Sequence, residues 1–340
     1  MWSAAIEPHM TLNRGLVGLT WILRAIVSLV LVVLVVASVG DGGLLDALSR
    51  AWKRWYALIP ALIIPPAAGY LLALFRLSSL LRTQNIVVPR LQLLKAILVG
   101  AFFNQLLPTS VGGDAYTAWD VNRSANHLTE IVATMVLSRV MGVIALCALI
   151  LIGCMWNPSW LTEIPALKLV VPALLLVTIG IAGAFLLVKP APVQPAGGGS
   201  VLGHRWRRVS MAFDRARRDR EAMTVAALYS LCLQTEIVVQ YWLFGWTLGM
   251  QLDFSRFLVA APIVTLAAML PLSLNGIGIR EWVMIWICAP LGIGEADAAM
   301  MAMLFVLANL FYAAVGGLIF LRISLQRVAA VSPQLARVLE

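Results

Sequence analysis

Six stretches of the sequence are apolar for about 20 residues or more, and this feature constrains the fold most. An apolar helix of that length spans the hydrocarbon core of a bilayer. Lipid offers no water to the backbone, so such stretches fold as helices that satisfy their own hydrogen bonds. The chain of 340 residues is 61% hydrophobic and 12% charged, which excludes an ordinary soluble domain. We predict one all-α, polytopic membrane domain over residues 1–340. Its spans are 16–39, 55–75, 129–153, 168–188, 222–248 and 296–321.

Two shorter apolar stretches, 91–107 and 256–270, each run into a proline that is followed by glycines. Proline removes a backbone donor and glycine tolerates unusual backbone angles, so each stretch is expected to end one helix before another begins. One such break alone would be an ordinary turn, but paired breaks in two halves of a chain indicate a transporter binding site. The break residues are Pro108, Gly112, Gly113, Pro271, Gly276 and Gly278. Asn104 and Asn275 flank the breaks and are candidates for substrate binding, and their first expected role is to satisfy backbone groups that the breaks release.

Basic residues gather in some loops and not in others, which predicts the orientation of the chain. The segments 76–95 and 189–221 and the C-terminal tail are basic and are expected in the cytoplasm, whereas 154–167 contains no basic residue. One loop disagrees, because 40–54 should be outside yet carries Arg50, Lys53 and Arg54. The prediction is a multi-pass protein of the plasma (inner) membrane with cytoplasmic N- and C-termini. The net charge of +9 is explained by this orientation rather than by nucleic acid.

This orientation makes both broken segments return to the side from which they came. The first is then a re-entrant hairpin from the cytoplasm, and the second is a re-entrant hairpin from outside. The order span, span, hairpin, span occurs twice, so we predict an inverted-topology repeat of about 10–154 and about 168–325, with a basic linker at 189–221. The arm 91–107 is about 25 Å long and would nearly cross the membrane, which leaves full crossing open. In the linker, Arg205 to Arg220 has the pattern of a surface helix on the anionic leaflet, or serves only to set topology.

The sequence shows no catalytic or metal-binding pattern. The four cysteines form no CxxC motif, and there is no Cys/His cluster, Walker loop or Ser/His/Asp pattern. We therefore expect no cofactor, no metal and no ATP hydrolysis within the chain.

The stretch from Asn104 to Asp114, followed by Ser138-Arg139 and Gly142, resembles the transmembrane region of lysylphosphatidylglycerol synthase/flippase proteins and their stand-alone relatives. The stretch from Pro271 to Glu281 and the pair Gly316-Gly317 fit as well, so the resemblance covers about 10–325. It implies a membrane protein that moves lipids between leaflets. The implied partners are membrane lipids: anionic phospholipids, polyprenyl-phosphate-linked molecules or hopanoid-type lipids. The family's soluble aminoacyl-transferase domain does not follow residue 340, so no synthase activity is expected.

Charged residues within apolar segments are expensive, so each is a candidate for substrate binding. Arg139 lies ten residues into its span and is expected to bind a phosphate or to form an ion pair with Asp114 or Glu236. Asp114 has the alternative role of helix cap. Glu236 is expected in a buried structural pair, with proton coupling as the alternative.

Two further candidates follow the second break. Arg280 is expected to join exposed amides of Gly276 and Gly278 in binding an anion, opposite Arg139 in one central cavity. Glu281 is expected to cap the following helix.

The favoured function is transbilayer movement of an amphiphile with an anionic head group, held between the two hairpins. One alternative is a membrane-embedded transferase that acts on a lipid-linked substrate at Asp114 or Glu281. The other is a non-transporting scaffold of an envelope-lipid synthesis complex. A homo-oligomer or envelope-synthesis partners are compatible with each of them.

Overall fold

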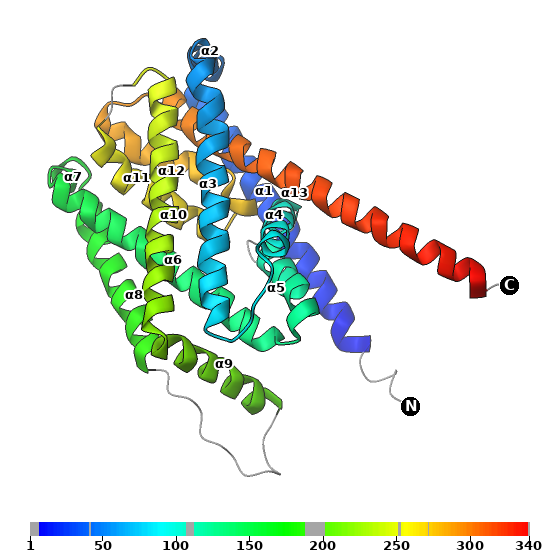
Figure 1. Cartoon of the computed structure of the whole chain (residues 1–340). Coiled ribbons are helices and arrows are strands. Elements are labelled where there is room, and N and C mark those ends of the chain that lie inside the picture. The colour runs from blue at the N-terminus through cyan, green and yellow to red at the C-terminus, as the bar shows by residue number, and fades with distance from the viewer. Residues whose placement is uncertain are drawn as a thin grey trace.

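The computed structural model describes residues 7–40, 42–106, 112–187, 201–250, 253–270 and 272–338. Within these ranges the chain forms helices joined by short loops and contains no strand, which confirms the all-α class (Figure 1). Pro108 and Pro271, predicted as break residues, lie outside the described ranges.

The predicted spans are all helices. They are α1 (Glu7–Val39), α3 (Trp55–Arg82), α6 (Leu128–Trp156), α8 (Leu167–Leu187), α10 (Arg220–Thr247) and α13 (Glu295–Val338). Among the described residues, five of these helices are long and apolar enough to cross a membrane. A sixth span results if the end of α1, Leu23–Val39, is joined to α2 (Gly43–Lys53), which turns away from it by 82°. The chain is therefore a multi-pass membrane protein with five or six apolar membrane-spanning helices.

Each predicted break separates two short helices. The first lies between α4 (Arg90–Leu106) and α5 (Gly112–Ala125). The second separates α11 (Phe254–Met269) from α12 (Ile279–Cys288), with a single 3₁₀ turn, η1 (Leu274–Gly276), between them. In Figure 1, α4 and α5 lie in the half of the bundle nearer α9 (Val201–Arg218), and α11 and α12 lie in the other half. The prediction that these stretches interrupt helices is confirmed, whereas the re-entrant hairpins remain a prediction.

The helices on either side of the breaks pack in a reciprocal way. At the centre, α3 runs along α10. On one flank α4 packs against α13, and on the other flank α11 packs against α6. The two flanking pairs correspond to each other when the two predicted repeats are interchanged, as two copies of one structural unit would require. The inverted repeat itself remains a prediction.

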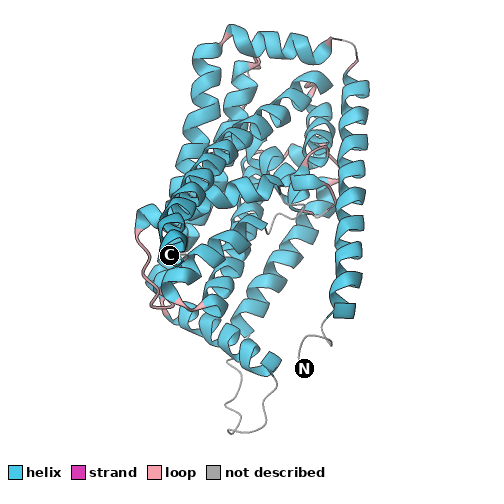
Figure 2. Cartoon of the chain, turned by 90° about the vertical axis from the view of Figure 1, so that its right-hand side faces the viewer, coloured by secondary structure: helices cyan, strands magenta, loops and turns pink. Residues whose placement is uncertain are grey.

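The two ends of the bundle are closed by helices that lie across it. In Figure 2, α2 crosses one end and α9 crosses the opposite end. On α9, Ala212 and Ala216 are buried, and the Ala212 carbonyl accepts a hydrogen bond from Gln84 Nε2 at 2.9 Å. The outer face of α9 carries Trp206, which is exposed. The predicted amphipathic helix is thus present, with one face packed on the bundle.

Both arginines of the exceptional loop 40–54 have structural partners. Arg50 of α2 forms an ion pair with Asp297 at the start of α13. Arg54 donates a hydrogen bond to the Trp246 carbonyl at 2.6 Å and lies over the Trp246 ring. These contacts hold α2 against the ends of α10 and α13, which gives both arginines a role apart from orientation.

Candidate functional site

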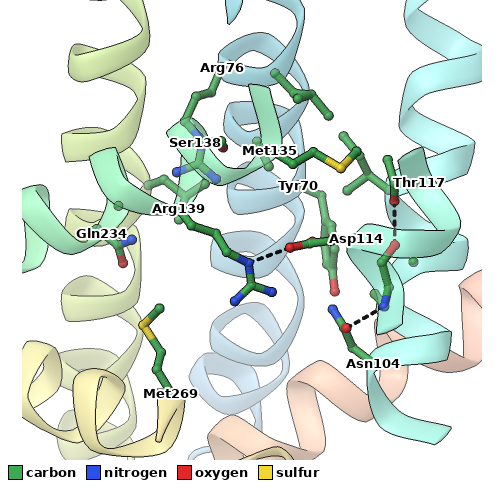
Figure 3. A pocket seen from close by; sticks show the side chains of 18 of the residues that line it. Tyr70, Arg76, Asn104, Asp114, Thr117, Met135, Ser138, Arg139, Gln234 and Met269 are labelled. Carbon is green, nitrogen blue, oxygen red and sulfur yellow. Dashed lines mark hydrogen bonds and ion pairs between the residues drawn. The ribbon is translucent and has the colours of Figure 1, made fainter. Parts of the chain in front are cut away.

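A cavity of about 360 Å³ lies in the middle of the bundle, next to the first break. Six helices line it: α3, α4, α5, α6, α10 and α11 (Figure 3). Its volume falls within the usual range of small-molecule sites, about 300–1,000 Å³. Most of its wall is apolar, and its polar groups come from a few side chains on different helices.

Among the described residues, two arginines and one carboxylate line this cavity. Arg139 Nε on α6 donates to Asp114 Oδ2 on α5 at 2.5 Å, which joins the second helix of the first break to a long span (Figure 3). Both side chains of the pair remain about one-third exposed, at 37% and 36%. Of the two acids expected as partners of Arg139, Asp114 is the one that binds it. The charges of the lining residues that the structure describes, Arg76, Arg139 and Asp114, sum to one net positive charge.

Arg76 is the second arginine, and it was not predicted as a site residue from the sequence. It was assigned to the loop after residue 75, but α3 continues to Arg82 and carries Arg76 into the cavity wall. The signal in the sequence is the helical spacing of Leu74, Leu77 and Leu81, all of which are buried. Arg76 Nε is buried and makes no hydrogen bond. A buried guanidinium donor without a partner is costly, so its position in a cavity wall favours a bound acceptor.

The start of α5 is fixed by polar contacts with α4. Asn104 Oδ1 accepts a hydrogen bond from the Gly113 amide at 2.8 Å, as expected of a residue that satisfies a released backbone group (Figure 3). Thr117 Oγ1 of α5 contacts the Ala96 carbonyl of α4 at 3.1 Å and the Gly113 carbonyl of its own helix at 2.9 Å. A Cβ atom at Gly113 would overlap the Gly100 carbonyl oxygen, so glycine is required for the close approach of these helices. Asp114 is therefore held in place from the first turn of α5.

The two breaks contact each other directly. Asn275 Nδ2 donates to Gln105 Oε1 at 2.6 Å, which connects the second break to the end of α4. Asn275 has a left-handed backbone, with φ of 48°. Its side chain thus bonds another side chain rather than a released backbone group, unlike the expectation. The Leu274 amide, in the same turn, donates to Ser28 Oγ of α1 at 2.8 Å.

The residues after the second break differ from the expectation in one respect. The Gly278 amide donates to Glu281 Oε2 at 2.6 Å, so Glu281 caps α12 as predicted. This bond occupies an amide that was expected to be exposed for an anion, and Gly276 and Gly278 are both buried. Arg280 lies over the Phe305 ring, 4.7 Å from its centroid, and is not among the residues that line the central cavity. The second arginine of the cavity is therefore Arg76.

Glu236 lies in a separate cavity of about 220 Å³ between α3, α4, α10 and α13. Its Oε1 atom is buried and has no hydrogen-bond partner, so the expected structural pair with Arg139 is not formed. Gln240, one turn further along α10, has a local structural role. Its Nε2 contacts the Ala61 carbonyl at 3.5 Å, and that carbonyl lacks its usual helical donor because the donor position is Pro65.

The chain matches the family described as the lysylphosphatidylglycerol synthase TM region over residues 21–316. Comparisons with curated proteins and with solved structures returned no match.

Proposed function

The chain belongs to the lysylphosphatidylglycerol synthase TM-region family, a family of membrane proteins in lipid handling, and from this premise we propose that it moves a lipid with an anionic head group between leaflets. The head group binds in the central cavity, while the acyl or isoprenoid tail stays in lipid between helices. The proposed setting is a plasma (inner) membrane with both termini and α9 on the cytoplasmic side, as the distribution of basic residues favours.

The pair of arginines in the cavity is the observation that carries this proposal. A guanidinium offers a planar fork of donors that matches the oxygens of a phosphate. Arg139 is partly engaged by Asp114, and Arg76 presents a buried donor without a partner. The single excess positive charge suits a phosphodiester, which carries one negative charge.

The helix breaks support movement rather than static binding. The cavity borders the first break through Gly113 and Asp114 and reaches Met269, the last residue before the second. The Gln105–Asn275 hydrogen bond joins the breaks at this level. In transporters with inverted repeats, rocking of one repeat against the other exposes such a site alternately to each side. The proposed repeats, about 10–154 and about 168–325, would supply this motion.

The geometry gives less support to the transferase alternative. It required Asp114 or Glu281 as a reactive acid. Asp114 is bound to Arg139, and Glu281 caps α12 with its Gly278 hydrogen bond while almost fully buried.

The test is a flipping assay with purified protein in vesicles that contain fluorescent phosphatidylglycerol. Arg139→Gln and Arg76→Gln should each slow flipping by about tenfold or more, because a hydrogen bond to a charged group contributes roughly 1.5–3 kcal/mol. Arg139→Lys should restore the rate only in part, since an ammonium keeps the charge and loses the planar fork. Arg50→Gln is the matched control, because it removes an exposed arginine from an ion pair outside the cavity.

Asp114→Asn separates a binding role of the pair from a structural one. If Asp114 competes with the head group for Arg139, its removal should tighten the binding of phosphatidylglycerol, whereas Arg139→Gln should weaken it. If the pair only stabilises the fold, both variants should lose folded protein and the double variant should recover it. Wild-type flipping in the double variant would refute the head-group assignment.

A further inference from the structure

Glu236 is a partly buried residue with a carboxylate that the head-group site does not use. It lies in the middle of α10, between Gln234, which lines the central cavity, and Gln240. Its Oε1 atom is inaccessible to solvent and has no hydrogen-bond partner. A charged, unpaired carboxylate at this depth is expensive, so a function is the default explanation for its presence.

The surroundings of Glu236 leave room for its carboxyl group but supply no cation. Gly69 on α3 faces it, and a Cβ atom at Gly69 would lie 2.7 Å from Glu236 Oε2. The titratable groups that face Glu236 are Tyr70 from α3 and Tyr312 from α13. From α4 the neighbour is Ile97, and no lysine or arginine in the described part of the chain lines this cavity. Tyrosine hydroxyls ionise near pH 10 in water, so Glu236 is the group that exchanges protons here at lower pH.

A metal ion fits this site poorly. Among the described residues, no group of three or more His, Cys, Asp or Glu side chains is placed to hold a metal. One carboxylate with phenol, amide and apolar neighbours provides too few oxygens for an alkali or alkaline-earth ion, which takes about six. A proton requires only the carboxylate itself.

The Glu236 cavity and the central cavity share a wall. Tyr70, Ala73, Ile97, Leu233 and Ile237 line both of them. Gln234 lines only the head-group side and Glu236 only the other. Residues two apart lie on nearly opposite faces of a helix whose diameter with side chains is about 10–12 Å. A bound head group beside Gln234 would therefore lie on the order of 10 Å from the Glu236 carboxylate.

We propose that Glu236 is a proton-binding site coupled to head-group occupancy of the central cavity. The step is a simple protonation, in which the carboxylate takes one proton from water to give the neutral acid. This inference rests on the proposed function, because it assigns a coupling partner to the same substrate site. A negative head group and a negative Glu236 repel each other across the shared wall, so each anion that binds favours uptake of a proton. Two unit charges about 10 Å apart at an effective dielectric constant near 20 change the affinity roughly tenfold.

The sign of the pH dependence follows from this repulsion. Protonated Glu236 favours the anion, so affinity is highest at low pH and falls as pH rises and the carboxylate loses its proton. The phosphodiester of phosphatidylglycerol keeps its charge throughout, so the ligand does not contribute to the change.

The experiment measures the affinity of the purified chain in detergent for dioctanoyl phosphatidylglycerol from pH 5 to pH 9. For the wild type, Kd should rise about tenfold across this range. Glu236→Gln mimics the protonated acid, so its Kd should stay near the low-pH value throughout. Glu236→Asp keeps a carboxyl group and should retain a pH dependence. Glu130→Gln is the matched control, because Glu130 is buried with an unpaired Oε2 but lines neither cavity.

Each outcome separates the two proposals. No binding of phosphatidylglycerol by the wild type at any pH would refute the proposed function. Binding with the same pH dependence in wild type and Glu236→Gln, or no pH dependence in the wild type, would overturn the proton site and leave the proposed function standing. Replacement of sodium by choline should change nothing, and a sodium-dependent Kd that Glu236→Gln abolishes would show a sodium site instead. In vesicles, an imposed pH gradient should change the net direction of flipping for the wild type but not for Glu236→Gln.

Discussion

Replacement of Gly113 by alanine tests whether the first break is built on close helix contact. Gly113 lies in the first turn of α5, where a Cβ atom would overlap the Gly100 carbonyl oxygen and come within 2.7 Å of the Asn104 side chain. Neither neighbour moves easily. The Gly100 contact is with a backbone carbonyl oxygen, and the Asn104 side chain accepts a hydrogen bond from the Gly113 amide at 2.8 Å. Accommodation of one methyl group therefore requires α4 and α5 to separate.

The expected loss of stability follows from these contacts. Overpacking of a closely packed site costs about 1–3 kcal/mol. Loss of the hydrogen bond between Asn104 and the Gly113 amide adds roughly 0.5–1.5 kcal/mol. The sum is about 1.5–4.5 kcal/mol, against a gain of about 0.5–1 kcal/mol that alanine gives over glycine within a helix. Because Asp114 is the next residue, the same movement should displace the Arg139 ion pair and weaken head-group binding.

The assay is thermal unfolding of purified protein in detergent, with Gly180→Ala as the matched control. Gly180 lies in α8, and no atom lies within 4 Å of the position that its Cβ would take. Gly113→Ala should lower the Tm by several degrees, at a few degrees per kcal/mol for a chain of this size. Gly180→Ala should leave the Tm unchanged or raise it. If Gly113→Ala has the same Tm as the wild type, the inferred contact between α4 and α5 is wrong.

The remaining predictions concern the second break and the topology. Gly278 has φ of +88° and a Cβ there would lie 2.5 Å from Leu31 Cβ, whereas Gly292 has φ of +70° and open space around it. Gly278→Ala should therefore lower the Tm more than Gly292→Ala. Both substitutions strain a left-handed backbone, but only the one at Gly278 also displaces α1. Equal shifts in Tm would contradict this prediction. Gly278→Val should in addition abolish flipping while the protein still inserts. For topology, a tag after Gly198 should be accessible from the cytoplasm and a tag near Pro158 from the periplasm, and cytoplasmic access at both sites would exclude three crossings per repeat.

The parts of the fold that depend on local chemistry could be predicted from the sequence. Runs of apolar residues predicted the long helices, because a segment in lipid must pair its own backbone N–H and C=O groups, and a helix does so. Proline and glycine located the two breaks, because their effect acts on the nearest residues. The cap that Glu281 provides to α12 was predicted for the same reason, since the Gly278 amide lies three residues away.

Parts of the site that depend on packing between distant helices were not predicted. Arg76 was placed in a loop because the hydropathy of α3 falls there, although the helix continues to Arg82. Arg280 was expected in the central cavity, but its guanidinium packs on Phe305 of α13. From the sequence, both Asp114 and Glu236 were candidate ion-pair partners for Arg139. Only the packing of α5 against α6 selects Asp114. Spacing along the chain does not contain this information, because each choice depends on how helices face one another.

The composition of the central cavity fits a site that must release its ligand as well as bind it. The Arg139–Asp114 pair is too exposed to add much to stability, since pairs of this kind contribute about 0–1 kcal/mol. Yet both charges are costly to place within a membrane domain, so stability alone does not account for them. Two arginines without a carboxylate would hold a phosphodiester tightly enough to slow its departure. In the proposed site, Asp114 offers Arg139 an alternative partner, so a departing head group exchanges its ion pair with Arg139 for the pair between Arg139 and Asp114. We therefore propose that Asp114 sets the rate of release, while Arg76 and Arg139 set the preference for an anion.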